Sequence, residues 1–294
     1  MSNTSISHKN DRRRDPTESG SITLMNVMKR FLSVLWGTEE HSVQVYRHIK
    51  EASSILGDIP IKDFSNEHIE ILLRYYKEKG NKVSTINRKL SSLSKLVRHS
   101  HRLGLIHDKP FFPFRKEKKG RVRFLSKEEE EKILSSIKAR NYLEYSLVIF
   151  LLDTGARMGE ALSLTYDDID FNSKTVSFWE TKTNSSRTVY LTDRAVTAVQ
   201  RKCCTEGPFK AINRWTFRKH WDKAKIDAGL KDDNLVVPHV LRHTCASRLV
   251  QGGVDIRRVK EWLGHKTIEM TLRYSHLSPK DLKMCVDVLD NKHS

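Results

Sequence analysis

Apolar residues recur at intervals of three and four along most of this chain, and that spacing restricts it to a largely helical fold. Between residues 21 and 105 the pattern predicts four short helices. Ser65 and Ser84 are typical N-cap residues for the third and fourth, and Gly104 is typical of a helix end. We therefore expect a small helical domain over residues 21–106, preceded by a mobile polar tail over residues 1–20.

A second domain is predicted over residues 125–294. Ser126 and Glu129 form a capping-box pattern at its start. Residues 175–179 and 187–191 read as two antiparallel strands joined by a polar turn, and helical patterns occupy most of the remainder. The expected fold is mainly α with a small antiparallel β-sheet: a helical domain, then a mixed α/β domain that ends in a helix at about residues 279–290.

The charge of the chain points to a polyanionic partner. Lys and Arg number 53 against 36 Asp and Glu, which leaves a formal net charge of +17. Nucleic acid is the first candidate and an anionic membrane surface is the second. The longest apolar run, near residues 147–152, is far below the roughly 20 residues that cross a bilayer. Neither a secretory signal nor a basic amphipathic helix with an aromatic apolar face is found, so we expect a cytoplasmic, DNA-binding protein and no membrane contact.

Two basic segments are the candidate DNA contacts. No acidic residue lies between Glu78 and Asp108, whereas a merely solvated helix face normally mixes both signs. Residues 107–124 hold two prolines and a strong basic excess, which is typical of a linker. The expected phosphate contacts are Lys79, Lys82, Arg88, Lys89, Lys95, Arg98 and Arg102 in the helical domain, and Arg115, Lys116, Lys118, Lys119, Arg121 and Arg123 in the linker.

Two segments of the second domain carry arginines that are candidates for a role in catalysis. In TGARMGEAL, Gly155 permits a sharp turn from which Arg157 projects, although a surface Arg after a helix end fits equally well. In PHVLRH, His239 and Arg242 share a helix face. The spacing of His239 and His243 suggests zinc, but the Glu of a zincin motif and a third ligand at a usual spacing are lacking. We favour a buried, structural His243 beside a functional His239–Arg242 pair.

Three further candidates complete the set. His265 follows a glycine, Tyr274 lies nine residues later in a polar setting, and Lys182 ends the first strand of the hairpin. Arginines bind non-bridging phosphate oxygens, His or Lys moves protons, and a Tyr hydroxyl attacks phosphorus. Without paired carboxylates the set does not fit a two-metal nuclease. These residues predict phosphoryl transfer that needs neither a metal ion nor a cofactor.

The order of these motifs resembles the tyrosine recombinases, the phage-integrase family. The resemblance rests on Arg157 in TGARMGEAL, Lys182 in a β-turn, His239-x-x-Arg242-His243, Leu263-Gly264-His265 and Arg273-Tyr274-Ser275-His276. It covers about residues 125–280 in detail. Residues 22–105 look, more loosely, like the core-binding domain of that family, which gives a two-domain, Xer-like layout.

The resemblance implies a site-specific recombinase or integrase that cleaves and rejoins DNA through a 3′-phosphotyrosyl intermediate. Tyr274 is then the nucleophile, His239 the general base and Lys182 the general acid. The phosphate is held by Arg157, Arg242 and His265.

The resemblance also implies the partners and the setting. They are a double-stranded recombination site, a homotetramer on synapsed DNA joined by the C-terminal helix, and accessory DNA-bending or directionality proteins. The setting is the cytoplasm or nucleoid of a bacterial host. The resemblance does not decide the natural task, and we favour integration or excision of a phage or other mobile element. The alternatives are a type IB topoisomerase-like enzyme, an Xer-like dimer-resolving recombinase and a non-catalytic DNA-binding regulator. A further alternative is that the C-terminal helix docks on its own chain instead of on a neighbouring subunit.

Overall fold

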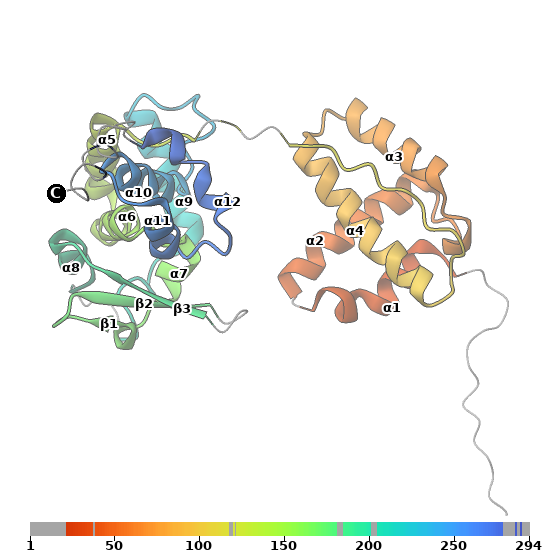
Figure 1. Cartoon of the computed structure of the whole chain (residues 1–294), viewed down its shortest axis with the longest axis horizontal. Helices are drawn as coiled ribbons and strands as arrows, with labels where there is room; N and C mark the ends of the chain where they lie inside the picture. Colours follow the sequence, from red (N-terminus) through yellow and green to blue (C-terminus); the bar gives the residue numbers. More distant parts are fainter. Residues whose placement is uncertain are drawn as a thin grey trace, which may run out of the picture. The chain divides into compact units, whose positions relative to one another are not determined.

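The computed structural model describes residues 22–37, 39–117, 120, 122–180, 185–200, 205–278, 286 and 289. The chain divides into two compact units, residues 1–119 and 120–294 (Figure 1). Three predicted features lie outside the described residues: the tail over residues 1–20, Lys182, and the C-terminal helix apart from Val286 and Leu289.

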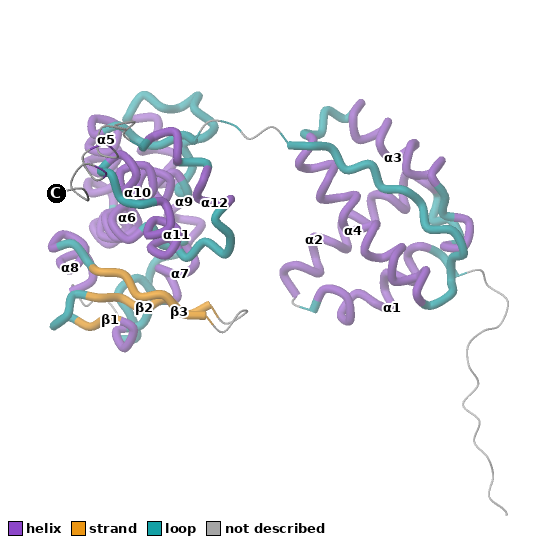
Figure 2. Tube along the Cα trace, viewed as in Figure 1, coloured by secondary structure: helices purple, strands orange, loops and turns teal. Residues whose placement is uncertain are grey.

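The first unit contains the four predicted helices and no strand among its described residues (Figure 2). Their apolar stripes meet in one core, where Leu24, Ile49, Leu72 and Leu93 are fully buried. Lys82, rather than Ser84, occupies the N-cap of the last helix. The elements are α1 (Leu24–Trp36), α2 (Glu39–Leu56), the 3-10 turn η1 (Ile61–Asp63), α3 (Asn66–Glu78) and α4 (Val83–Arg102).

The first unit extends beyond the predicted boundary at residue 106, because part of the predicted linker packs on its helices. Phe112 is buried and stacks on Phe64, with 6.5 Å between ring centroids. The Asn87 side chain makes two hydrogen bonds with the backbone of Arg115, at 2.8 and 3.1 Å. Composition predicted a linker here, but buried aromatic rings and side-chain amides fasten residues 107–117 to the helical unit.

Among its described residues, the second unit is helical with a three-stranded antiparallel sheet in the order β1-β2-β3. Strands β2 and β3 form the predicted hairpin, whereas β1 was not predicted. In the hairpin, Val176 pairs with Val189 and Phe178 pairs with Arg187. The elements are α5 (Lys127–Arg140), α6 (Tyr142–Thr154), α7 (Met158–Ser163), the 3-10 turn η2 (Tyr166–Asp168), β1 (Ile169–Asp170), β2 (Thr175–Glu180), β3 (Ser185–Tyr190), α8 (Asp193–Gln200), α9 (Arg214–Asp227), α10 (Val240–Gln251), α11 (Ile256–Leu263), α12 (Glu269–Leu272) and the 3-10 turn η3 (Ser275–Leu277).

Helix α6 is the centre of this unit, since it contacts α5, α8 and α10. Its residues Leu147, Val148 and Phe150 are fully buried, as its continuous apolar sequence predicts. The helix ends at Gly155, which adopts the left-handed conformation with φ of 64°. The central helix thereby fixes where the chain turns towards Arg157.

Gly155 lies so close to its neighbours that a side chain there must be costly. A Cβ at this position would lie 2.7 Å from Leu263 Cδ2. We expect Gly155→Ala to lower the free energy of unfolding by about 3 kcal/mol, from left-handed strain plus overpacking. Gly229 is the matched control, because it has φ of 75° and a Cβ there would meet no heavy atom within 4 Å. Gly229→Ala should lose only about 1 kcal/mol in the same denaturant titration. Equal losses would show that the contact with Leu263 is unimportant.

Candidate active site

Arg242 connects three segments of the second unit. Its side chain leaves α10 and is only 3% exposed. Its Nη1 donates to the carbonyl of Gly155 at 2.7 Å, and its Nη2 donates to the carbonyl of Leu263 at 2.6 Å. Burial and the neighbouring Arg157 and Arg187 guanidinium groups lower the pKa of Arg242 to about 10. The group thus stays charged at neutral pH and holds the ends of α6 and α11 together.

Arg157 stands immediately before α7 and shares a carboxylate with a second arginine. Its Nη1 donates to Glu160 Oε1 at 2.7 Å, and Arg187 Nη2 donates to Glu160 Oε2 at 2.6 Å. Burial raises the pKa of Glu160, but the hydrogen bonds and charges of Arg187 and Arg157 outweigh burial and lower it to about 2. Arg187 also donates from Nε to the carbonyl of Trp262 at 3.2 Å, which ties β3 to α11.

His265 lies directly after Gly264, which ends α11 in the left-handed conformation. The His265 ring is buried, and its Nδ1 lies 2.8 Å from Thr271 Oγ1. Burial and the charges of Arg242 and Arg157 lower the pKa of His265 to about 4, so this ring is neutral at neutral pH.

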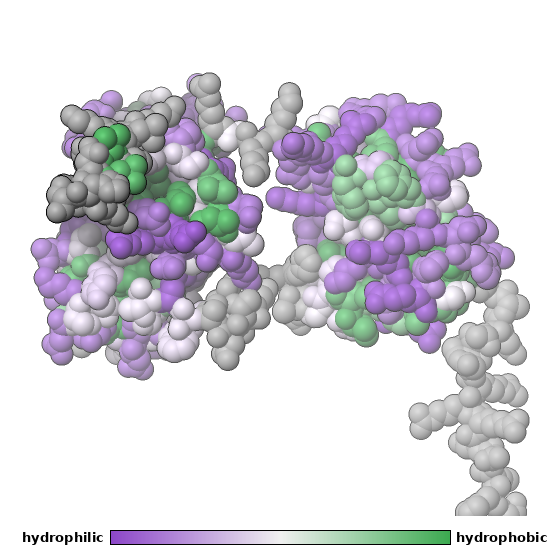
Figure 3. Space-filling view, in the orientation of Figure 1, coloured by the Kyte–Doolittle hydropathy of each residue, from purple (hydrophilic) through white to green (hydrophobic). Residues whose placement is uncertain are grey.

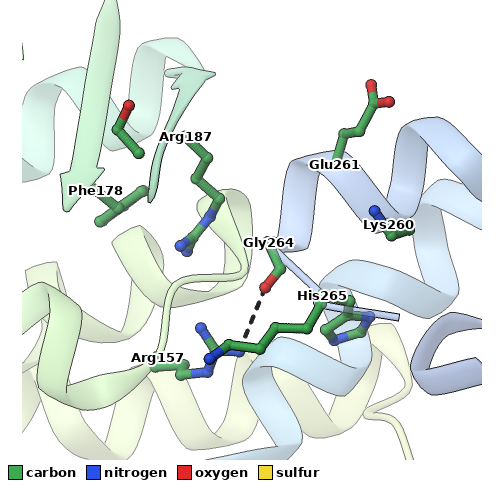
Figure 4. Close-up of a pocket in the computed structure, with 9 residues that line it drawn as sticks. Arg157, Phe178, Arg187, Lys260, Glu261, Gly264 and His265 are labelled. Carbon is green, nitrogen blue, oxygen red and sulfur yellow. Dashed lines mark hydrogen bonds between the residues drawn. The ribbon is translucent and has the colours of Figure 1, made fainter. Parts of the chain in front are cut away.

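A cavity of about 330 Å³ lies beside these groups (Figure 4). Its lining includes the side chains of Arg157, Arg187, Lys260 and His265, which Figure 4 shows arranged around the same space. Guanidinium groups bind phosphate oxygens through two parallel hydrogen bonds, which an ammonium cannot reproduce. The cavity is therefore suited to a phosphate group.

Tyr274 follows α12 and is 1% exposed. It packs against Val250 and Leu263, and its hydroxyl lies 2.6 Å from His243 Nδ1. Burial raises the pKa of Tyr274, so its hydroxyl is protonated at neutral pH. His239, at the N-cap of α10, sets its ring perpendicular to that of His243, with 4.8 Å between centroids.

The structure brings five of the six predicted catalytic residues into one region of the second unit. Arg157 and His265 line the cavity, Arg242 binds the backbone beside both, and His239 and Tyr274 each contact His243. The sixth, Lys182, lies outside the described residues, between the end of β2 and the start of β3. His243 is only partly buried, whereas a buried, structural histidine was expected, and its contact with the tyrosine hydroxyl was not predicted.

Three residues that contribute to the site, Glu160, Arg187 and Thr271, were not predicted from the sequence. Glu160 had a signal, because it lies three residues after Arg157 and can return to it on the same helix face. Arg187 and Thr271 had none. Arg187 meets Trp262 across 75 residues of chain, so only the tertiary fold reveals that contact.

Some of the basic residues predicted to contact DNA in the first unit form ion pairs or hydrogen bonds within the fold instead. Lys82, Arg88, Arg98 and Arg102 are exposed, in keeping with a DNA-facing role. Lys79 pairs with Glu51 at 3.0 Å, and Lys95 is half-buried against the Leu35 carbonyl. Lys89 is 7% exposed, pairs with Glu51 at 2.6 Å and lies over the Tyr76 ring. Burial and the ion pair with Glu51, which Lys89 shares with Lys79, hold the Lys89 ammonium inside the helical unit. This position does not favour the predicted phosphate contact of Lys89.

The basic residues of the predicted linker, residues 107–124, also fall into exposed residues and residues that form ion pairs within the fold. Arg115 and Lys116 are exposed, while Lys118, Lys119 and Arg121 lie outside the described residues. Arg123 binds Glu129 at 2.6 Å and Asp233 at 2.8 Å, and these partners raise its pKa. These two carboxylates hold the Arg123 guanidinium against the second unit, which does not favour the predicted phosphate contact. Figure 3 shows hydrophilic residues over much of the visible face of the first unit.

The described part of the chain contains neither a candidate metal site nor a candidate membrane-spanning helix. Within residues 22–278, apart from the undescribed gaps, three or more His, Cys, Asp or Glu side chains nowhere gather into a group that could hold a metal ion. Among the helices that the structure describes, none is long and apolar enough to cross a membrane.

Comparison with known proteins gives consistent matches over both units. Residues 123–281 match the model of the phage integrase family, and residues 28–102 match that of the phage integrase N-terminal SAM-like domain. Tyrosine recombinase XerC of Alcanivorax borkumensis is 26% identical, with 94% of this chain and 96% of the relative covered. The integrase of Escherichia phage P2 is 29% identical over 85% of this chain and 72% of its own.

The fold is also found among solved structures. The lambda integrase tetramer bound to a Holliday junction aligns with a TM-score of 0.71 at 20% identity, covering 86% of this chain and 77% of that chain. At that identity the likeness concerns the fold alone. The family model, by contrast, spans more than half of this sequence and includes every predicted catalytic position. The chain belongs to the phage integrase family.

Proposed function

We propose that this protein is a site-specific DNA recombinase that cleaves and rejoins strands through a covalent 3′-phosphotyrosyl bond at Tyr274. The observation that carries the proposal is the placement of the Tyr274 hydroxyl on His243, next to a cluster that joins Arg157, Arg242 and His265. Family membership supports the same reaction class.

The arginines supply the electrostatic part of catalysis in this proposal. The scissile phosphate enters the cavity lined by Arg157 and His265, beside the Arg242 guanidinium. Negative charge grows on the non-bridging oxygens as Tyr274 attacks, and these groups stabilise it. Removing one such preorganised donor typically lowers a rate on the order of 10²–10³-fold.

The proton transfers need an acceptor at the tyrosine and a donor at the leaving group. A free tyrosine has a pKa of about 10, and burial raises that of Tyr274 further, so attack requires a base. His239 and His243 both lie in this part of the site. We propose Lys182, in the turn between β2 and β3, as the acid that protonates the leaving 5′-oxygen. The covalent link conserves the phosphodiester bond energy for rejoining.

The natural task proposed is integration or excision of a phage or other mobile element, in the cytoplasm or nucleoid of a bacterial host. XerC-like resolution of DNA dimers is the second candidate, because the XerC likeness spans nearly the whole of both chains. Four subunits on two synapsed recombination sites, with accessory DNA-bending or directionality proteins, complete the proposed assembly. The lambda integrase of the same fold forms a tetramer on a Holliday junction, which motivates the four subunits. The accessory proteins rest on the family resemblance alone.

The nucleophile is tested by Tyr274→Phe. We expect this variant to bind its DNA site normally and to form no covalent protein–DNA adduct on a nicked substrate, because the attacking oxygen is gone. Tyr190→Phe is the matched control, since Tyr190 is a largely exposed tyrosine of β3. The control should form the adduct at the normal rate. An adduct formed by the Tyr274→Phe protein would contradict the assignment.

The DNA-facing surface of α4 is tested by the salt dependence of binding. The slope of log K against log salt is negative, and each phosphate contact contributes about −0.9 to it. Replacing Arg88, Arg98 and Arg102 with Gln should therefore make the slope less negative by roughly 2 to 3 units. The control replaces Lys127, Lys132 and Lys138, exposed lysines of the acid-rich helix α5, with Gln. It removes the same charge and should leave the slope unchanged. Equal slopes for both triple variants would show that α4 is only solvated.

The C-terminal segment is tested by deleting residues 279–294. The sequence places Leu282, Cys285, Val286 and Leu289 on one face of the helix predicted over about residues 279–290. We propose that this apolar face docks on a neighbouring subunit, a head-to-tail contact that can close a ring. The truncated protein should bind a single site normally and lose cooperative binding to paired sites, measured by gel shift. Normal assembly of synaptic complexes would instead favour docking within the same chain.

A further inference from the structure

We infer that His243 is a further catalytic residue, whose Nδ1 positions the hydroxyl of Tyr274 and takes its proton as the oxygen attacks phosphorus. The inference rests on the proposed function, since it assigns one step of that reaction to a particular side chain.

The geometry of the pair is that of a strong hydrogen bond. His243 Nδ1 and Tyr274 Oη are 2.6 Å apart, and the two ring centroids are 5.9 Å apart. A candidate base must lie within about 2.6–3.2 Å of the proton donor, and His243 meets that condition. The tyrosine is held from its backbone too, because its N–H donates to the carbonyl of Thr271 at 2.9 Å.

The surroundings of His243 keep its ring neutral in the resting site. His239 and Arg242 face it from its own helix, Arg273 faces it from beside the tyrosine, and His265 faces it from the segment after α11. Burial together with these groups lowers the pKa of His243 to about 4. The ring therefore offers a lone pair to the protonated hydroxyl, and the hydroxyl donates.

The same surroundings explain how the base becomes effective when DNA is bound. The cations that disfavour a charged His243 include Arg242, which we place on the scissile phosphate. A bound phosphate brings negative charge to this cluster, and more charge develops during attack. Both changes favour the imidazolium form of His243, so proton transfer is linked to occupation of the phosphate site.

His239 is a weaker candidate for the base that takes the tyrosine proton, because its ring does not meet the hydroxyl. Its ring contacts that of His243, at 83° between ring planes, and the hydroxyl of the tyrosine is held by His243 instead. After burial, the groups that lower the pKa of His239 are Arg242, Arg157 and Arg273, two of which belong to the phosphate cluster. Arg242 and Arg273 act on both rings, so the distinction rests on geometry: His243 Nδ1 meets the tyrosine hydroxyl, whereas Arg157, which lines the cavity, is among the groups that act on His239. We therefore assign His239 to the phosphate side and His243 to the nucleophile.

The step balances without any further reactant. A lone pair of Tyr274 Oη forms the bond to phosphorus, the bond from phosphorus to the 5′-oxygen breaks, and the tyrosine proton moves to His243 Nδ1. The leaving 5′-oxygen takes its proton from the separate acid. In rejoining, the 5′-hydroxyl returns its proton to the separate acid, now in its basic form, as its oxygen attacks phosphorus. The tyrosine oxygen leaves, and His243 returns the proton to it.

The test is the pH dependence of single-turnover cleavage on a nicked substrate, using the full chain. Wild-type cleavage should be nearly independent of pH between about 6 and 9, because the base is already neutral there. His243→Ala should be slower by on the order of 10²–10⁴-fold at neutral pH, and its rate should rise about tenfold per pH unit as hydroxide replaces the base. His243→Asn, which retains a polar side chain but cannot take the proton, should show the same slope.

Two comparisons make the result decisive. His239→Ala should lose a similar factor at every pH, because it removes a phosphate contact rather than the base. A substrate with a sulfur leaving group at the 5′ position should not rescue His243→Ala, since it bypasses only the acid. Parallel pH profiles for His243→Ala, His243→Asn and wild type would overturn the inference, as would a steep profile for His239→Ala. Failure of the wild-type protein to form any adduct would instead overturn the proposed function.

Discussion

The concentration of positive charge around one carboxylate is the constraint on which the second unit depends. Arg157 and Arg187 both bind Glu160, while Arg242 is buried against two backbone carbonyls. Removing cations from water is costly unless hydrogen bonds and opposite charge compensate for it. Here one anion serves two guanidinium groups, so the cluster retains a strong preference for a further anion. In the proposed function a DNA phosphate is that anion, so the same arrangement would serve both binding and catalysis.

Backbone turns give this cluster its shape. Gly155 and Gly264 both adopt left-handed conformations, at the ends of α6 and α11. Arg242 binds the carbonyl of Gly155 and that of Leu263, next to the second turn. The helices of the core therefore determine where Arg157 and His265 stand. The β2-β3 hairpin reaches the same site through Arg187, which lines the cavity and binds the Trp262 carbonyl.

Much of this arrangement follows from the sequence, and most of the exceptions have a common cause. Apolar spacing predicts the helices and the hairpin, and local motifs predict the catalytic candidates, because those signals lie within a few residues of one another. The position of Lys89 was misjudged because its partner Glu51 lies on another helix. Arg123 binds a distant carboxylate, Asp233, but also Glu129, which is only six residues away and whose contact could have been anticipated. As for Lys89, the sequence indicated a buried His243 but could not show that its ring meets Tyr274. The roles of the individual site residues remain predictions for experiment.

The most direct measurement is identification of the protein–DNA bond itself. A nicked recombination substrate should trap the covalent complex, which can be digested with protease and nuclease and analysed by mass spectrometry. The account predicts one modified peptide, with a nucleotide attached through its 3′-phosphate to Tyr274, and a free 5′-hydroxyl on the released strand. Attachment at another residue, a 5′-phosphate linkage, or cleavage with no covalent peptide would contradict it.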